Sequence, residues 1–253
     1  MIRVAHVVSV ESSNYYLNNL IDFSDSGKVK YIMITLGAES VFTQEMRARG
    51  IEVLVVPAIS LKQKFKAVQQ IRQILQQTRA DIVHTHLFIP SLIGIRAGQK
   101  AGIKGMTTRH HSDALYNISS WLKRKIWLRL EHYVNRKAHH IIAPSQMVYD
   151  ILVQKEKVPA SRVSLIPYGQ TTERFDAITP EMIRATREEL KMEGKISMVC
   201  VARLFNRKGH TYLFKAMGAL SKDYPQLEVY LVGIGPSREQ LAQMATENGM
   251  ASQ

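Results

Sequence analysis

The chain has 253 residues, of which 45% are hydrophobic, and this is enough for one large or two ordinary domains with a sizeable core. Its 34 Lys and Arg against 21 Asp and Glu give a formal net charge of +13, which predicts an anionic partner such as nucleic acid, an anionic membrane surface or a phosphorylated substrate. The single cysteine, Cys200, excludes an intrachain disulfide, the apolar N-terminal residues are too short for a signal peptide, and no apolar run reaches the roughly 18 residues of a membrane span, so a cytoplasmic protein is expected.

Short apolar runs alternate with helix-length segments along the first two thirds of the chain. Strands are predicted at residues 4–9, 31–36, 53–57, 82–86, 105–109, 140–143 and 163–167, and helices at residues 64–77, 90–101 and 120–138. Near-continuous apolar strands separated by helices are typical of a parallel sheet that is covered on both faces. The sequence therefore predicts a doubly wound α/β fold.

Four histidines lie near the ends of two of these strands. His84 and His86 flank Thr85 and are predicted to point to opposite faces of the sheet, which excludes a side-by-side metal pair. His110 and His111 follow the next strand, at the edge where ligands bind in such folds. Because no cysteine or carboxylate lies at a metal-ligand spacing, no metal site is predicted.

The predicted helix at residues 120–138 combines apolar and basic side chains. Its apolar residues recur near helical spacing beside a set of cations, which are Lys123, Arg124, Lys125, Arg129, Arg136 and Lys137. One interpretation is a basic amphipathic helix that holds the protein peripherally at the inner membrane surface. The other is an ordinary surface helix whose aromatic stripe faces the core, and a globular domain needs such stripes in any case.

A domain boundary is predicted where Pro167 and Gly169 end a strand, which gives domains at residues 1–168 and 169–253. In the second domain, an apolar strand runs into a turn with Arg203, Arg207 and Lys208 and then into a helix at residues 210–219. Cations at a helix N-terminus favour an anion, so this turn predicts a diphosphate site, although either cation alone could simply solvate a loop. A second strand, at residues 227–232, leads into a glycine-containing turn and another helix.

An ordered set of motifs resembles family 4 glycosyltransferases, which have the GT-B fold. In the second domain the set comprises Val201-Ala-Arg-Leu with Lys208-Gly209, followed by Gly233-Ile-Gly235-Pro236; upstream, residues 81–86, 141–145 and 163–169 resemble landmarks of the family in the same order. The resemblance implies two Rossmann-like domains and transfer of a sugar, with retention of configuration, from a nucleoside diphosphate sugar to a glycan, lipid or small-molecule acceptor. It implies no cofactor and no metal.

The resemblance also assigns residues. Arg203 and Lys208 would bind the donor diphosphate, and His111 would be the catalytic histidine that lines the sugar pocket. Further donor or acceptor contacts are expected from Ser13, Asn14, His110, Gly233 and Gly235. Two doubly wound units in one chain would form a cleft that faces the carboxyl ends of both sheets, so the site is expected between the two domains.

Two features depart from the family pattern. The Gly-Gly turn after the first strand is replaced by residues 11–19, where Ser12, Ser13 and Asn14 are predicted to cap the next helix. The family's two glutamates separated by seven residues have no match, since Glu181/Glu189 and Glu239/Glu247 lie in amphipathic helical segments and are read as solvated. We therefore expect an incomplete second domain with an unpaired sheet edge, and no appreciable transferase activity from the 253-residue chain alone.

Two alternatives remain open on the sequence. A sugar-nucleotide epimerase of related architecture would interconvert donor sugars without an acceptor. A basic nucleic-acid-binding protein would also suit the charge, but neither a recognition helix nor an aromatic RNA-stacking motif is present, so nucleic acid is not the expected partner.

Overall fold

The computed structural model describes residues 1–110 and 118–247. The chain divides into two compact units, Met1–Thr171 and Thr172–Gln253, which we call unit 1 and unit 2. This division lies close to the boundary that Pro167 and Gly169 suggest. In the described ranges, no helix combines the length and the apolar character needed to cross a bilayer.

Unit 1 is built on a seven-stranded sheet in the order β3-β2-β1-β4-β5-β6-β7. All neighbouring strands pair in parallel, as the alternation of strands and helices predicts. The strands are β1 (Ile2–Val8), β2 (Val29–Leu36), β3 (Glu52–Val56), β4 (Ile82–His86), β5 (Lys104–Thr108), β6 (His140–Ala143) and β7 (Val163–Leu165).

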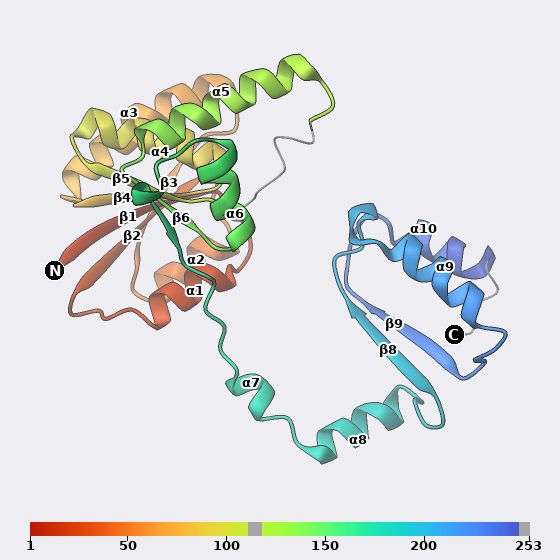
Figure 1. Ribbon diagram of the computed structural model, residues 1–253. Helices are drawn as coiled ribbons and strands as arrows, with labels where there is room; N and C mark the ends of the chain where they lie inside the picture. The colour runs from red at the N-terminus through yellow and green to blue at the C-terminus, as the bar shows by residue number, and fades with distance from the viewer. Residues whose placement is uncertain (111–117, 248–253) are drawn as a thin grey trace. The chain divides into compact units, whose positions relative to one another are not determined.

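Helices cover both faces of this sheet (Figure 1). They are α1 (Tyr15–Asp22), α2 (Val41–Ala48), α3 (Leu61–Gln77), α4 (Phe88–Ala101), α5 (Trp121–Lys137) and α6 (Gln146–Asp150), with α6 continuing as the π-helical turn Ile151–Lys155 and a 3-10 turn at Ala160–Arg162 before β7. Helices α3 and α4 share one buried core with the sheet, and α1 and α2 share another on the opposite face. The sequence predicted α3, α4 and α5 with their residue ranges and α1 only through its cap, whereas the short helices α2 and α6 were not predicted.

The alternation of side chains along β1 explains the two cores. Ala5 and Val7 are fully buried against α3 and α4, whereas Val8 packs with α1 and α2. Successive residues of a strand point to opposite faces, so residues of even number in β1 face α1 and α2. His6 therefore belongs to the α1 and α2 side of the sheet.

Serine or asparagine side chains cap the N-termini of the described α-helices of unit 1 except α4. Ser40 and Ser60 form capping boxes with Thr43 and Gln63, and Asn14 accepts a hydrogen bond from the backbone N–H of Leu17. These bonds satisfy backbone donors that a helix leaves unpaired in its first turn. Asn14 thus has the capping role that the sequence predicts.

Unit 2 has a two-stranded parallel sheet, β8 (Ile196–Val201) and β9 (Leu227–Val232). Its helices are α7 (Glu173–Asp176), α8 (Pro180–Glu189), α9 (His210–Leu220) and α10 (Arg238–Glu247), with a 3-10 turn at Asn206–Lys208. Leu204, Phe214, Met217, Leu227 and Leu241 form its small core. Glu181, Glu189, Glu239 and Glu247 are exposed, in agreement with their reading as solvated side chains.

The β8 strand has an open edge within the described part of unit 2, because its only pairing there is with β9. Val199 is 58% exposed and Val201 is 77% exposed, although a strand of this composition is normally buried on both faces. The unpaired edge predicted from the sequence is therefore present in the described part of unit 2, together with exposed apolar surface on β8. Such an edge is a template for pairing with another chain.

Candidate functional site

The order of strands in unit 1 reverses between β1 and β4. From β1 the chain proceeds outward to β2 and β3, and it then returns to the other side of β1 for β4 to β7. In open α/β sheets, ligands bind outside the carboxyl ends of the strands at such a reversal. The residues that follow β1, β4 and β5 therefore form the candidate site of unit 1.

Helix α1 begins directly after β1 at this edge. Asn14 caps it through its side-chain oxygen, which lies 3.0 Å from the nitrogen of Leu17, and the Ser13 hydroxyl accepts from the Asn18 amide at 3.1 Å. Ser13 and Asn14 are thus occupied in shaping the start of the helix. Their contact with a donor or an acceptor stays a prediction.

Three buried histidine rings gather on one face of β1 and β4. His84 and His86 lie with ring centroids 4.2 Å apart, and His6 lies 4.9 Å and 5.1 Å from them. The prediction that His84 and His86 point to opposite faces is wrong, because residues two apart on a strand share a face. His6 was not predicted as a site residue. It lies opposite His84 in the pairing of β1 with β4, and this pairing places the two side chains on the same face of the sheet.

This correction removes one reason for excluding a metal. His6, His84 and His86 can each offer one ring nitrogen, and these atoms lie within 4.8 Å of one another. Burial lowers the pKa of His6 to about 3, and burial, followed by the neighbouring histidines, lowers the pKa of His84 and His86 well below the usual value. The three rings are therefore neutral at physiological pH.

His110 extends this group toward the carboxyl edge of the sheet. It lies 5.3 Å from His86 and 5.8 Å from Tyr168 between ring centroids, and Tyr16 of α1 packs edge-on against it at 5.2 Å. His111, the predicted catalytic histidine, lies outside the described residues. The sequence did not predict the roles of Tyr16 and Tyr168, because aromatic residues in loops and first turns carry no pattern of their own.

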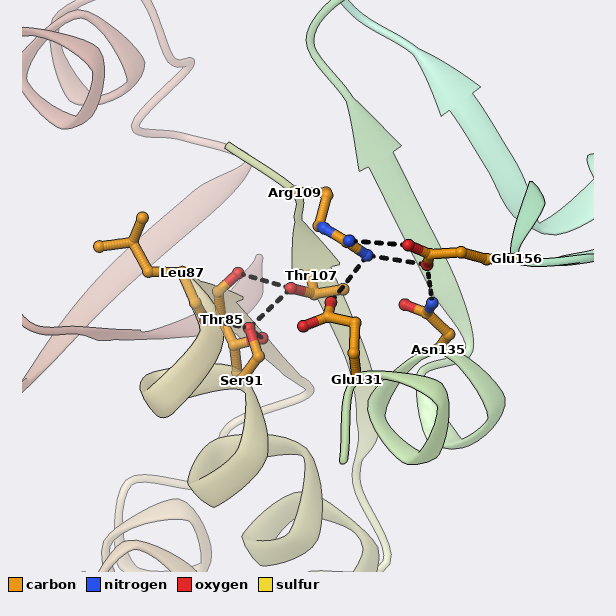
Figure 2. A network of polar contacts seen from close by, with 8 residues as sticks. All are labelled: Thr85, Leu87, Ser91, Thr107, Arg109, Glu131, Asn135 and Glu156. Atoms are coloured by element: carbon orange, nitrogen blue, oxygen red, sulfur yellow. Dashed lines mark hydrogen bonds and ion pairs between the residues drawn. The ribbon is translucent and has the colours of Figure 1, made fainter. Parts of the chain in front are cut away.

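Arg109, the residue before His110, is the centre of a buried ionic network (Figure 2). The Arg109 guanidinium forms two bonds with Glu156, at 2.9 and 3.0 Å, and an ion pair with Glu131 of α5 at 2.7 Å. Asn135, one turn further along α5, donates to Glu156 at 2.5 Å. The Arg109 network therefore fixes the end of β5 to α5 and to the segment after α6.

The Arg109 network holds two carboxylates against one guanidinium. Burial raises the pKa of Glu131 from 4.5 to about 7, against the opposing effect of Arg109 and with a further rise from Glu156. Glu131 thus changes its charge near neutral pH.

We expect the raised pKa of Glu131 to make unit 1 less stable as the pH rises from about 4.5 to about 7. In that window the folded chain keeps a proton that the unfolded chain has released, and a shift of this size corresponds to about 3 kcal/mol. Glu131→Gln, which cannot ionise, should remove this loss. Urea unfolding followed by the fluorescence of Trp121 and Trp127, both in unit 1, would measure it, and equal pH profiles for the two proteins would contradict it.

In unit 2, the predicted diphosphate residues lie on the turn between β8 and α9. Arg203 and Lys208 are both exposed, and neither forms an ion pair within the described residues. The Arg203 guanidinium lies 4.5 Å from the centre of the Phe205 ring, a cation–π contact that holds it beside the turn. Gly209, with φ +80°, is the N-cap of α9, and no side chain caps this helix. Its own N–H donates to the Asn206 carbonyl at 3.3 Å, so the uncapped N-terminus of α9 begins at His210.

Gly233 and Gly235 bring the turn after β9 against the turn after β8. A Cβ atom on Gly233 would lie 2.0 Å from the Ala202 carbonyl oxygen, and one on Gly235 would lie 2.3 Å from the Leu204 carbonyl oxygen. The Leu204 N–H donates to the Ile234 carbonyl at 3.0 Å across this contact. The two glycines therefore position the turn that carries Arg203, and their contact with a ligand stays a prediction.

The first half of α5 exposes apolar and basic side chains together. Trp121 is 66% exposed and Ile126 is 49% exposed, and Lys123, Arg124 and Lys125 between them are exposed as well. The second half packs on the sheet, with Val134 and Asn135 buried. The interpretation as a core-facing stripe thus holds for the second half only.

Comparison with known proteins gives matches over both units. The sequence profile of Glycosyltransferase Family 4 matches residues 28–174, more than half of the chain, and that of Glycosyl transferases group 1 matches residues 182–253. Among curated proteins, the alpha-monoglucosyldiacylglycerol synthase of Acholeplasma laidlawii is 23% identical over 228 residues, which are 84% of this chain and 56% of that protein. The chain thus spans little more than half the length of this relative.

Two solved structures illustrate the likeness in fold. Anabaena HepE, crystallised in complex with UDP, aligns over 99% of this chain and 67% of its own, with a TM-score of 0.80 and 18% identity. The UDP-GlcNAc 2-epimerase from Methanocaldococcus jannaschii aligns over 99% of this chain and 70% of its own, with a TM-score of 0.62 and 11% identity. At these identities the likeness concerns the fold alone.

Proposed function

Because the chain belongs to glycosyltransferase family 4 and has the GT-B fold, we propose that the protein it represents transfers a sugar from a nucleoside diphosphate sugar to an acceptor hydroxyl. Unit 2 would bind the donor, and unit 1 would bind the acceptor. The observation that carries the proposal is the turn from β8 to α9, where exposed Arg203 and Lys208 precede a helix N-terminus that no side chain caps.

The chemistry follows from charge. Cleavage of the bond between the sugar and the nucleoside diphosphate leaves negative charge on the diphosphate, and fixed cations near that charge lower the barrier. Arg203 and Lys208 would supply the cations, and the N–H groups of α9 would add the positive end of a helix. No metal is required for this step. His111 would contact the reacting sugar from unit 1, with His110 beside it.

We propose a lipid acceptor, presented at an anionic membrane surface that α5 contacts peripherally. Trp121 and Ile126 would enter the interface between headgroups and acyl chains, and the cations between them would face the anionic headgroups. The similarity to a synthase of a glucosylated diacylglycerol supports a lipid acceptor rather than a soluble glycan. The anionic headgroups would also balance part of the net charge of +13.

Removing three cations from α5 should weaken binding to vesicles of phosphatidylglycerol and phosphatidylcholine by roughly 100-fold, since each basic side chain near such a surface contributes about 1 kcal/mol. A co-sedimentation assay would measure this. The variant is Lys123→Gln with Arg124→Gln and Lys125→Gln. The control removes the same charge from exposed residues at the amino edge of the sheet, through Lys28→Gln, Lys30→Gln and Lys104→Gln. Equal losses in both variants would contradict a specific role of α5.

Product analysis tests the proposed activity. The full-length gene product would be incubated with UDP-glucose, UDP-galactose, UDP-N-acetylglucosamine or GDP-mannose and with vesicles that contain diacylglycerol. Mass spectrometry should find the sugar on the lipid and the nucleoside diphosphate released. Interconversion of donor sugars without an acceptor would favour the epimerase instead, and tight binding to a nucleic-acid duplex at physiological salt in a gel shift would favour a nucleic-acid-binding protein.

A further inference from the structure

Four side chains form a line of hydrogen bonds from the buried middle of β1 to the carboxyl edge of the sheet. His6 Nδ1 lies 2.8 Å from His86 Nε2, His86 Nδ1 lies 3.1 Å from His110 Nε2, and His110 Nδ1 lies 2.5 Å from the Tyr168 hydroxyl. His6 and His86 are buried, whereas Tyr168 is 40% exposed. We call this line the histidine chain.

The rings of the histidine chain must all be oriented the same way. A neutral imidazole has one N–H donor and one acceptor nitrogen, so each ring that receives a hydrogen bond at one nitrogen donates at the other. Burial keeps His6 and His86 neutral, because it lowers the pKa of both rings. Two arrangements remain for His6 and His86: their N–H groups point toward the inner end at His6, or toward His110 and Tyr168.

The inner end decides between these arrangements. Within the described part of the chain, His6 Nε2 is buried and has no hydrogen-bond partner. If the N–H groups pointed toward His6, this nitrogen would carry a buried hydrogen without an acceptor, and orphaned buried N–H groups are rare in proteins. If they point toward Tyr168, His6 Nε2 keeps only an unused lone pair. The second arrangement leaves no hydrogen of the chain unsatisfied.

We propose that His6 and His86 are positioning residues that hold His110 protonated at Nδ1, so that Tyr168 accepts from His110 and presents its hydroxyl hydrogen to a ligand. We take this ligand atom, at the carboxyl edge of the sheet, to be a hydroxyl oxygen of the acceptor that receives the sugar. This assignment of the ligand rests on the proposed function. Tyr168 keeps its hydrogen across the physiological range, because burial raises its pKa to about 12.

The same rings fit a transition metal less well. Two nitrogens bound to one tetrahedral zinc ion lie about 3.3 Å apart, since each bond is about 2.0–2.1 Å long. The facing nitrogens of His6 and His86 are closer, at 2.8 Å, and His84 Nε2 already lies 2.8 Å from the Thr108 hydroxyl.

Nitrogen-15 NMR of the histidine rings in the full 253-residue chain tests the orientation without any substrate. His6, His86 and His110 should each be protonated at Nδ1, whereas free histidine prefers Nε2. His86→Phe should return His110 to the Nε2 form. The matched control is His84→Phe, the same change on the same strand face outside the histidine chain, and it should leave His110 unchanged.

Tyr168→Phe separates the two ends of the chain. Because the orientation is set at His6, this variant should leave His6 and His86 protonated at Nδ1. An Nε2 proton on His6 or His86 in the unchanged protein would overturn the proposal, and so would a stoichiometric transition metal in the purified protein. An Nδ1 proton that persists on His110 in His86→Phe would do the same.

The acceptor contact has its own readout. In the transfer assay with diacylglycerol vesicles, Tyr168→Phe should raise the KM for the acceptor about tenfold and leave the KM for the nucleotide sugar unchanged. Equal KM values in both proteins would overturn the contact. Absence of transfer by the unchanged protein would overturn the proposed function and this contact with it, while the ring tautomers would still decide the orientation.

Discussion

Replacing Arg109 with methionine should lower the free energy of unfolding of unit 1 by about 3–5 kcal/mol, because it leaves two buried carboxylates without their cation. Arg109 is 12% exposed, and Glu131 and Glu156 are 7% and 6% exposed, so water can do little to replace the guanidinium. Methionine has a similar length and cannot donate the lost bonds. Urea unfolding followed by tryptophan fluorescence would measure the change.

The control is Arg47→Met, which removes an arginine that also makes two bonds to a carboxylate. Arg47 and Glu39 are both well exposed, at 44% and 56%. An exposed ion pair gains little because water solvates both partners, so this variant should change stability far less. A loss from Arg109→Met no larger than that from Arg47→Met would contradict the role given to the Arg109 network.

Replacing Lys208 or Arg203 with alanine should weaken the binding of UDP or GDP by roughly 10–150-fold, which corresponds to about 1.5–3 kcal/mol for a hydrogen bond to a charged group. Each cation lies on the turn that leads into α9 and has no competing carboxylate among the described residues. NMR titration would give the dissociation constants even where binding is weak.

The matched control for this prediction is Lys215→Ala. Lys215 is exposed on α9 itself, further from the helix N-terminus, so its removal changes the net charge by the same amount without touching the turn. If nucleotides bound only through a general attraction to the positively charged chain, Lys208→Ala and Lys215→Ala would weaken binding equally, because each variant removes one positive charge. Such equality, or unchanged affinity in both Lys208→Ala and Arg203→Ala, would contradict a diphosphate site at this turn.

The sheet of unit 1 could be predicted from sequence because most of its strands are short runs rich in Val and Ile that alternate with helix-length segments. Residues 82–86 and 140–143 were predicted with the bounds that the structure has for β4 and β6. Helices α1 and α2 have only eight residues each, too few for a helical period to stand out. Their caps, Asn14 and Ser40, were the available signals, and only the first was used.

The candidate site was less accessible to sequence reasoning. The histidine cluster depends on the pairing of β1 with β4, which brings residues 6 and 84 together across a long stretch of sequence. Arg109, Glu131 and Glu156 likewise meet only in the folded unit, and no local pattern marks them. Conversely, the residues of the predicted diphosphate site could be identified from sequence because strand, turn and helix follow one another directly in the chain. These residues are Arg203, Lys208, Gly233 and Gly235.

The most direct test of a nucleoside diphosphate site in unit 2 compares UDP and GDP with uridine and guanosine by NMR titration of the 253-residue chain. The account predicts that the diphosphates shift the backbone resonances of Arg203, Lys208 and Gly209, at the start of α9, and that the nucleosides shift them far less, because the cations and the N–H groups of α9 act on the phosphates. Equal shifts from nucleoside and diphosphate, or shifts that leave this turn unaffected, would contradict it.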